Sequence, residues 1–95
     1  MELSDFEKYP ADEEMDETDV NLRCYFTRMD EAKVESYEPN MSDEELMKWD
    51  GNFKDDNTLM ITCSEREVDP CEYRRVMNLY LEFRKKLAAA GAGAR

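Results

Sequence analysis

The stretch at residues 69–87, DPCEYRRVMNLYLEFRKKL, predicts a long C-terminal helix around which the rest of the chain folds. Asp69 is a favourable N-cap residue, and Pro70 suits the first helical position because the amide there has no partner within a helix. Apolar side chains then recur every three or four residues, which is the spacing of one helix face. That face consists of Tyr73, Val76, Met77, Tyr80, Phe83 and Leu87.

Upstream of this helix the apolar residues recur every second position, which indicates strands. Residues 20–27, VNLRCYFT, alternate apolar and polar side chains, and residues 33–38 alternate again after a plausible turn. These two segments predict a hairpin. Residues 58–63, TLMITC, are the most strand-like run and predict a central strand, while residues 52–54 predict a brief further one.

A short helix is predicted from residue 43 to about residue 50. The sequence SDEE at 42–45 fits a capping box, Gly51 ends the helix, and Leu46 and Trp49 are its expected buried pair. The order of elements predicts an α+β fold. We expect a small antiparallel sheet of three to four strands, with the short helix and the long amphipathic C-terminal helix packed on one face.

The charge is distributed unevenly and suggests three parts of the chain. Residues 1–19 carry nine acids against one Lys, and such a segment is predicted to be an acidic flexible head. Phe6 and Tyr9 could still hold its first half against the domain or a partner. Residues 20–90 are expected to form a single domain, and residues 91–95 a disordered tail.

Three cysteines and no apolar segment near the N-terminus indicate a reducing compartment. We therefore expect a cytoplasmic protein, located in the cytoplasm of a host cell if the gene belongs to a phage. Cys24 and Cys63 fall on the apolar faces of predicted strands and are interpreted as core residues. Cys71 lies at a helix N-terminus, where a thiolate is favoured, so a redox role is the alternative for that residue.

The sequence offers little catalytic chemistry. The chain has no His, which removes the commonest general base and the commonest metal ligand. The cysteines lack CxxC spacing, and the acidic stretch at residues 50–57 departs from a calcium loop in the positions of its Gly and of its final Glu. We predict a non-enzymatic protein without cofactor or metal.

The net charge of −11 makes carboxylates the candidate binding groups. Nucleic acids and anionic membranes bind through Lys and Arg, so neither is an expected direct partner, whereas a basic protein surface is. Tyr25 and Tyr37, on the polar faces of the predicted strands, are expected to add anchors. The candidate acids are Asp43, Glu44 and Glu45 of the helix cap, Asp55 and Asp56 of a turn, and Asp12, Glu13, Glu14, Asp16 and Glu17 of the head. The simpler alternative is that these acids only maintain solubility.

These features predict an inhibitor that occupies a basic, nucleic-acid-binding surface of a target protein. In size, acidity and lack of catalytic motifs the chain is similar to phage-encoded anti-CRISPR and DNA-mimic proteins, although no sequence motif identifies either class. The alternative is an accessory subunit or adaptor of a cytosolic multiprotein complex. Such a subunit would use its sheet face or its basic helix end, with the acidic head as a tether.

Overall fold

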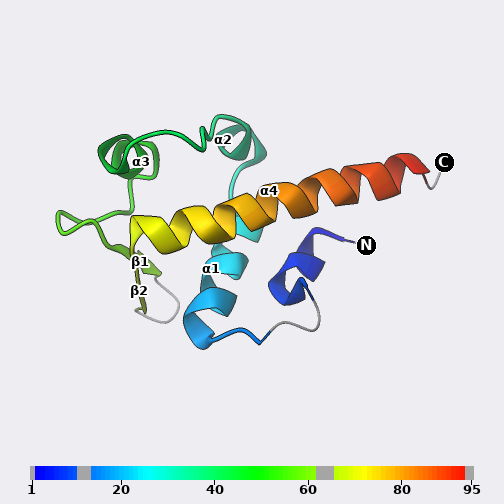
Figure 1. The fold of residues 1–95 in the computed structure, drawn as a ribbon, viewed down its shortest axis with the longest axis horizontal. Helices are drawn as coiled ribbons and strands as arrows, with labels where there is room; N and C mark the ends of the chain where they lie inside the picture. The colour runs from blue at the N-terminus through cyan, green and yellow to red at the C-terminus, as the bar shows by residue number, and fades with distance from the viewer. Residues whose placement is uncertain (1, 11–13, 62–65, 94–95) are drawn as a thin grey trace.

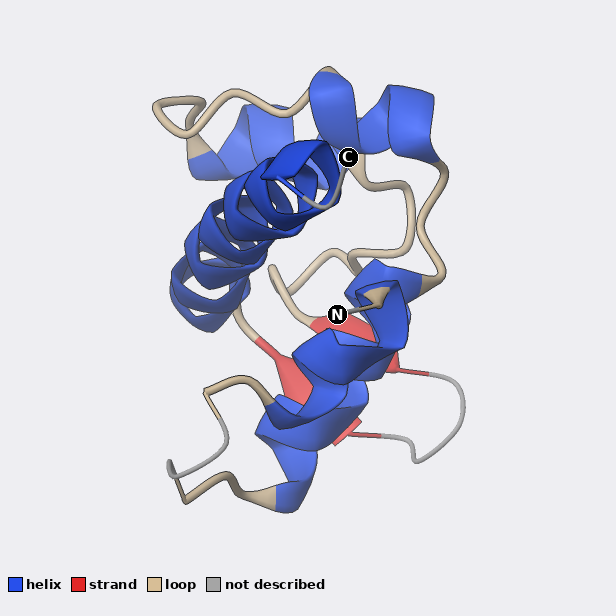
Figure 2. Cartoon of the chain, turned by 90° about the vertical axis from the view of Figure 1, so that its right-hand side faces the viewer, coloured by secondary structure: helices blue, strands red, loops and turns tan. Residues whose placement is uncertain are grey.

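The computed structural model describes residues 2–10, 14–61 and 66–93. The long helix α4 crosses the molecule, with α2 and α3 on one side and α1, η1 and a β-hairpin on the other (Figures 1 and 2). The elements in chain order are the 3-10 helix η1 (Leu3–Lys8), α1 (Glu17–Thr27), α2 (Glu31–Glu35), α3 (Asp43–Trp49), β1 (Leu59–Ile61), β2 (Arg66–Val68) and α4 (Pro70–Gly93).

Helix α4 confirms the expectation drawn from residues 69–87. The Asp69 carboxylate accepts a hydrogen bond from the amide of Glu72 at 2.8 Å, so it caps the helix as predicted. The predicted apolar face is fully buried at Tyr73, Val76, Met77, Tyr80 and Phe83. The helix continues to Gly93, so it includes the first residues of the segment expected to be a tail.

The predicted strand at residues 20–27 is wrong, because this segment belongs to helix α1. Leu22 and Phe26, the two apolar residues that become fully buried, are four positions apart and therefore fit both a strand face and a helix face. Val20, which would share the buried face of a strand with them, distinguishes the two cases because it is 37% exposed. Asp16 starts the helix by accepting a hydrogen bond from the amide of Asp19 at 2.7 Å.

The predicted strand at residues 33–38 is also wrong. Residues 31–35 form helix α2, whose N-cap Asp30 accepts hydrogen bonds from the amides of Ala32 and Lys33 at 2.9 and 3.3 Å. Val34 of α2 and Tyr37 of the following loop are both buried, and the amide of Tyr37 donates to the carbonyl oxygen of Val34 at 3.1 Å, which is a turn and not an extended strand. Asp30, predicted as part of a hairpin turn, thus caps a helix instead.

The sheet has two strands, not three to four. β1 and β2 pair antiparallel, with Leu59 opposite Val68 and Ile61 opposite Arg66. The predicted brief strand at 52–54 contributes one isolated bridge, between Phe53 and Leu59. The predicted central strand at 58–63 is shorter than expected, and its last two residues lie outside the described residues. The coarser prediction holds: a mixed fold with a small antiparallel sheet and a long C-terminal helix.

Helix α3 confirms the predicted short helix. The Ser42 hydroxyl accepts a hydrogen bond from the amide of Glu45 at 3.2 Å, and the helix ends at Trp49. Leu46 is fully buried, whereas Trp49 is half-buried and donates from its indole nitrogen to the Ser36 hydroxyl at 2.8 Å.

The aromatic core draws on both ends of the chain. Phe6 of η1 is fully buried, with its ring centroid 4.9 Å from that of Tyr80. Phe26 of α1 lies 4.9 Å from the Tyr73 ring by the same measure. The boundary expected at residue 19 falls within α1, and the flexibility of the head stays a prediction. Across the described ranges, no helix combines the length and apolar character needed to span a bilayer.

Candidate functional site

The acids of α3 and of the loop after it lie at one end of the molecule. Asp43, Glu44 and Glu45 occupy the first turn of α3, where the helix dipole favours negative charge, and all three are exposed. Asp55 and Asp56 are exposed in the loop between α3 and β1. Figure 1 shows this loop and α3 at the end of the molecule where α4 begins.

Arg74 of α4 reduces the charge that one of these acids presents. Its guanidinium donates to the Asp43 carboxylate and also, at 2.8 Å, to the carbonyl oxygen of Met41. The Asp43 side chain stays 58% exposed, so the pair is screened by solvent. Asp43 therefore contributes less to an acidic surface than its neighbours do.

The remaining acids at this end have little or no pairing with cationic side chains. Glu44 has only a long contact, 3.9 Å, with the equally exposed ammonium group of Lys48. Within the described part of the chain, no cation pairs with Glu45, Asp55 or Asp56. We call Glu44, Glu45, Asp55 and Asp56 the acidic end.

The two tyrosines expected as exposed anchors occupy other positions. Tyr37 is 7% exposed, and its ring packs against Trp49 with centroids 5.4 Å apart. Tyr25 is half-buried, and its hydroxyl donates to the Asp50 carboxylate at 2.8 Å. The sequence analysis places both on polar strand faces, but Tyr25 belongs to helix α1 and Tyr37 lies in the loop after helix α2. Burial raises the pKa of Tyr37 above its ordinary value.

The acids predicted in the head divide into two groups. Asp12 and Glu13 lie outside the described residues. Glu14, Asp16 and Glu17 are exposed at the start of α1. They are not part of the acidic end, because α1 lies on the opposite side of α4 from α3 (Figure 1).

The start of α1 lies close to the start of α4, which the sequence analysis did not detect. Burial raises the pKa of Glu72 above its ordinary value; the positive charge of Arg75 opposes this, and the charges of Asp16, Asp69 and Asp19 add to it. Arg75 contacts the carboxylates of Asp19 at 3.2 Å and Glu72 at 3.7 Å. Arg23 of α1 pairs with Asp19 as well, so a second acidic area forms where two helix N-termini meet, with two arginines paired to its acids.

Asp50 is the polar residue whose role the sequence reasoning missed. Its side chain is 0% exposed and accepts hydrogen bonds from the hydroxyls of Tyr25 and Tyr73, the latter at 2.7 Å. Asn52 donates to it from its backbone amide at 3.2 Å and from its side chain at 3.1 Å. No Lys or Arg forms an ion pair with Asp50 among the residues described. The signal for this role in the sequence is that the acid directly follows the apolar Trp49.

This network holds the end of α3 to α1 and α4. Burial, followed by the charge of Asp50, raises the pKa of both Tyr25 and Tyr73. The hydroxyls therefore stay protonated and remain donors to the carboxylate. The arrangement is a buried structural junction beneath the acidic end.

No protein-family model, curated protein or solved structure matches this chain. In the ranges 2–10, 14–61 and 66–93, no group of three or more Cys, Asp and Glu side chains is arranged to hold a metal ion. The candidate site is the acidic end, and the Asp50 junction supports it.

Proposed function

We propose that this chain is a non-enzymatic binding protein that places its acidic end on a basic, nucleic-acid-binding surface of another protein and blocks it. The observation that carries the proposal is that Glu45, Asp55 and Asp56 are exposed and have no cationic partner within the described residues. A protein that used its acids only for internal pairing would not leave its loop acids unpaired. An inhibitor of the anti-CRISPR or DNA-mimic kind, acting in the cytoplasm, is the specific form of this proposal.

The physical basis is electrostatic complementarity. A net charge of −11 attracts a basic surface over a Debye length of about 8 Å at physiological ionic strength, and this attraction mainly accelerates association. Carboxylates can then take the places that phosphates occupy on Lys and Arg side chains. The buried Asp50 junction supports this function because it fixes the end of α3 beside the loop that carries Asp55 and Asp56.

A charge-reversal experiment tests the proposal. The chain, immobilised through its C-terminus, captures partners from a lysate of the native host, and mass spectrometry identifies them. The variant Asp55→Lys/Asp56→Lys is expected to lose these partners. The matched control Glu35→Lys/Glu82→Lys changes the net charge equally at exposed positions outside the acidic end and is expected to retain them.

A salt titration with the purified partner gives the second readout. The affinity is expected to fall at least about tenfold from low to high salt, because screening weakens steering and exposed ion pairs. Unchanged affinity across the titration, together with binding by Asp55→Lys/Asp56→Lys, would reject the inhibitor proposal and favour the adaptor.

A further inference from the structure

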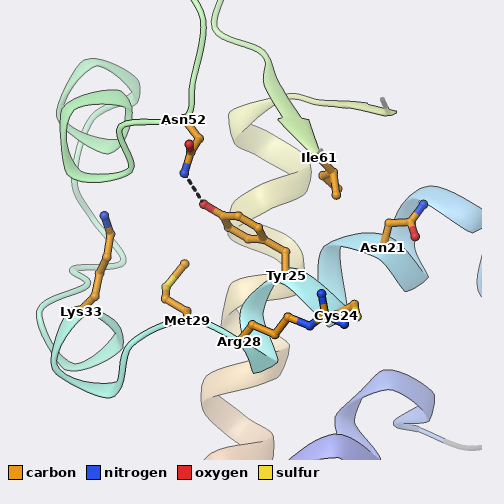
Figure 3. Close-up of a pocket in the computed structure, with 8 residues that line it drawn as sticks. All are labelled: Asn21, Cys24, Tyr25, Arg28, Met29, Lys33, Asn52 and Ile61. Carbon is orange, nitrogen blue, oxygen red and sulfur yellow. Dashed lines mark hydrogen bonds between the residues drawn. The ribbon is translucent and has the colours of Figure 1, made fainter. Parts of the chain in front are cut away.

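A groove of 350 Å³ lies along α1 and is lined by none of the acids of the acidic end. Tyr25 of α1, with Arg28 and Met29 directly after that helix, supplies one wall, and Lys33 of α2, Asn52 and Ile61 of β1 supply the others. Figure 3 shows the hydroxyl of Tyr25 directed at Asn52, and Arg28 and Lys33 on opposite sides of Met29. Its volume is at the small end of the range for ligand pockets.

The charge of this groove is opposite to that of the chain. Two cationic side chains line it, and no carboxylate does among the described residues. Neither Arg28 nor Lys33 forms an ion pair in the described ranges, although arginines elsewhere in those ranges pair with Asp or Glu. The Lys33 ammonium instead lies 5.1 Å from the centroid of the Trp49 ring. The groove thus presents two positive charges that no described carboxylate neutralises.

Between the two cations the groove has an apolar lining, and the polar groups of Tyr25 and Asn52 there are already hydrogen-bonded. The Tyr25 hydroxyl donates to Asp50 at 2.8 Å and accepts from the Asn52 amide at 2.9 Å, which leaves its ring face as a contact surface. Met29 adds a polarisable thioether that packs favourably against aromatic groups. A ligand would therefore meet an apolar surface between two cations.

We propose that this groove binds a small organic monoanion with a flat apolar body, such as an aromatic carboxylate. The apolar body would lie against Tyr25 and Met29, and the anionic group would pair with Arg28 or Lys33. A single negative charge fits best, because the net charge of −11 repels polyanions such as nucleotides more strongly. This site shares Tyr25 and Asn52 with the Asp50 junction, but it uses none of the acids of the acidic end.

The test uses benzoate as the probe and nitrogen-15 amide NMR as the readout. Sodium benzoate is expected to shift the signals of residues around the groove, including the Asn52 side chain, with saturation and a dissociation constant on the order of 1 mM. Neutral benzamide, which has nearly the same shape, and inorganic phosphate, which has no apolar body, are each expected to bind at least about tenfold more weakly.

Variants separate a specific site from general attraction. Arg28→Gln/Lys33→Gln is expected to weaken benzoate binding at least about tenfold, whereas the control Lys54→Gln/Lys85→Gln removes the same charge at exposed positions and should bind as the parent does. The single variants Arg28→Gln and Lys33→Gln, each expected to weaken binding by a smaller factor, serve if the double variant does not fold. Non-saturating shifts, equal binding of benzamide or phosphate, or equal losses in both double variants would overturn the proposal.

Discussion

At the scale of single residues, Asp50 is the side chain whose contacts matter most to the fold. A carboxylate buried without a cation is stable only when donors surround it, and here two tyrosine hydroxyls and the Asn52 amides do so. The residue connects three helices through hydrogen bonds rather than through apolar contact. Its replacement should therefore affect the whole fold and not one element.

We predict that Asp50→Ala lowers the free energy of unfolding by about 3 kcal/mol, because it leaves the buried donor Tyr73 and the half-buried Tyr25 without an acceptor. Urea denaturation measures this loss. Asp55→Ala, at an exposed loop position, is the matched control and should stay within about 0.5 kcal/mol of the parent. A loss below about 1 kcal/mol for Asp50→Ala would show that water satisfies these groups.

The same two tyrosines predict alkaline destabilisation. Their pKa values are raised in the folded state above the ordinary 10.0, so below pH 10 both states are protonated and the stability is unaffected. As the pH rises above 10, only the unfolded state releases these protons, and stability falls by up to about 1.4 kcal/mol per pH unit for each tyrosine. Urea denaturation at pH 9, 10 and 11 measures the slope. Tyr25→Phe/Tyr73→Phe should reduce it, and an unchanged slope would contradict this assignment.

At the scale of elements, capping acids locate the helices. Asp16, Asp30 and Asp69 each accept backbone amide hydrogen bonds at the start of a helix, and Ser42 does so for α3. Each cap satisfies at least one of the amides that have no partner within the helix, and Asp30 satisfies two. The N-cap is therefore a better guide in this chain than the interval between apolar residues.

We predict that Asp69→Ala lowers the free energy of unfolding by about 1 kcal/mol, because α4 loses the acceptor for the Glu72 amide. Asp69→Asn keeps a side-chain oxygen in place and should recover most of that loss. Thermal or urea denaturation distinguishes the two variants. Equal destabilisation by both would mean that the negative charge near the helix N-terminus matters, rather than the hydrogen bond.

The sequence predicts α3 and α4 well because each combines a cap with a helical apolar face. It fails for α1 because Leu22 and Phe26 fit both a two-residue repeat of apolar side chains and a 3.6-residue repeat. It fails for α2 because so short a helix has too few positions to show which repeat its apolar side chains follow. The acids of the candidate site were predictable as exposed because their elements were correct. The positions of Tyr25 and Tyr37 were not predictable, because Tyr25 lies on a helix, where side chains point in other directions than on a strand, and Tyr37 lies in the loop after α2. The buried role of Asp50 depends on contacts with residues far apart in the chain.

At the scale of the whole molecule, salt should act in opposite directions on folding and on binding. Raising the NaCl concentration from about 0.01 M to about 1 M shortens the Debye length from about 30 Å to about 3 Å. The self-repulsion of a chain with net charge −11 is then screened, and the pairs Lys48–Glu44, Arg74–Asp43 and Arg84–Glu31 have acids exposed enough that they contribute little. We predict that the melting temperature rises with salt while the affinity for a basic partner falls. A melting temperature that falls with salt would show that ion pairs dominate the stability.

Helix α4 follows in the chain every segment that it packs against, and this affects the order in which the protein can fold. Synthesis at about 5–20 residues per second takes roughly 3 to 14 s to reach Asp69, and the buried face of α4 emerges only after that. Until then Phe6 and Phe26 lack the Tyr80 and Tyr73 rings against which they pack in the folded protein, so the aromatic core forms only once α4 has been made. The residues before α4 carry 22 acids against seven bases, and like charge keeps growing chains apart. The acidity that we assign to partner binding is thus also expected to keep the nascent chain from aggregating before its long helix is available for packing.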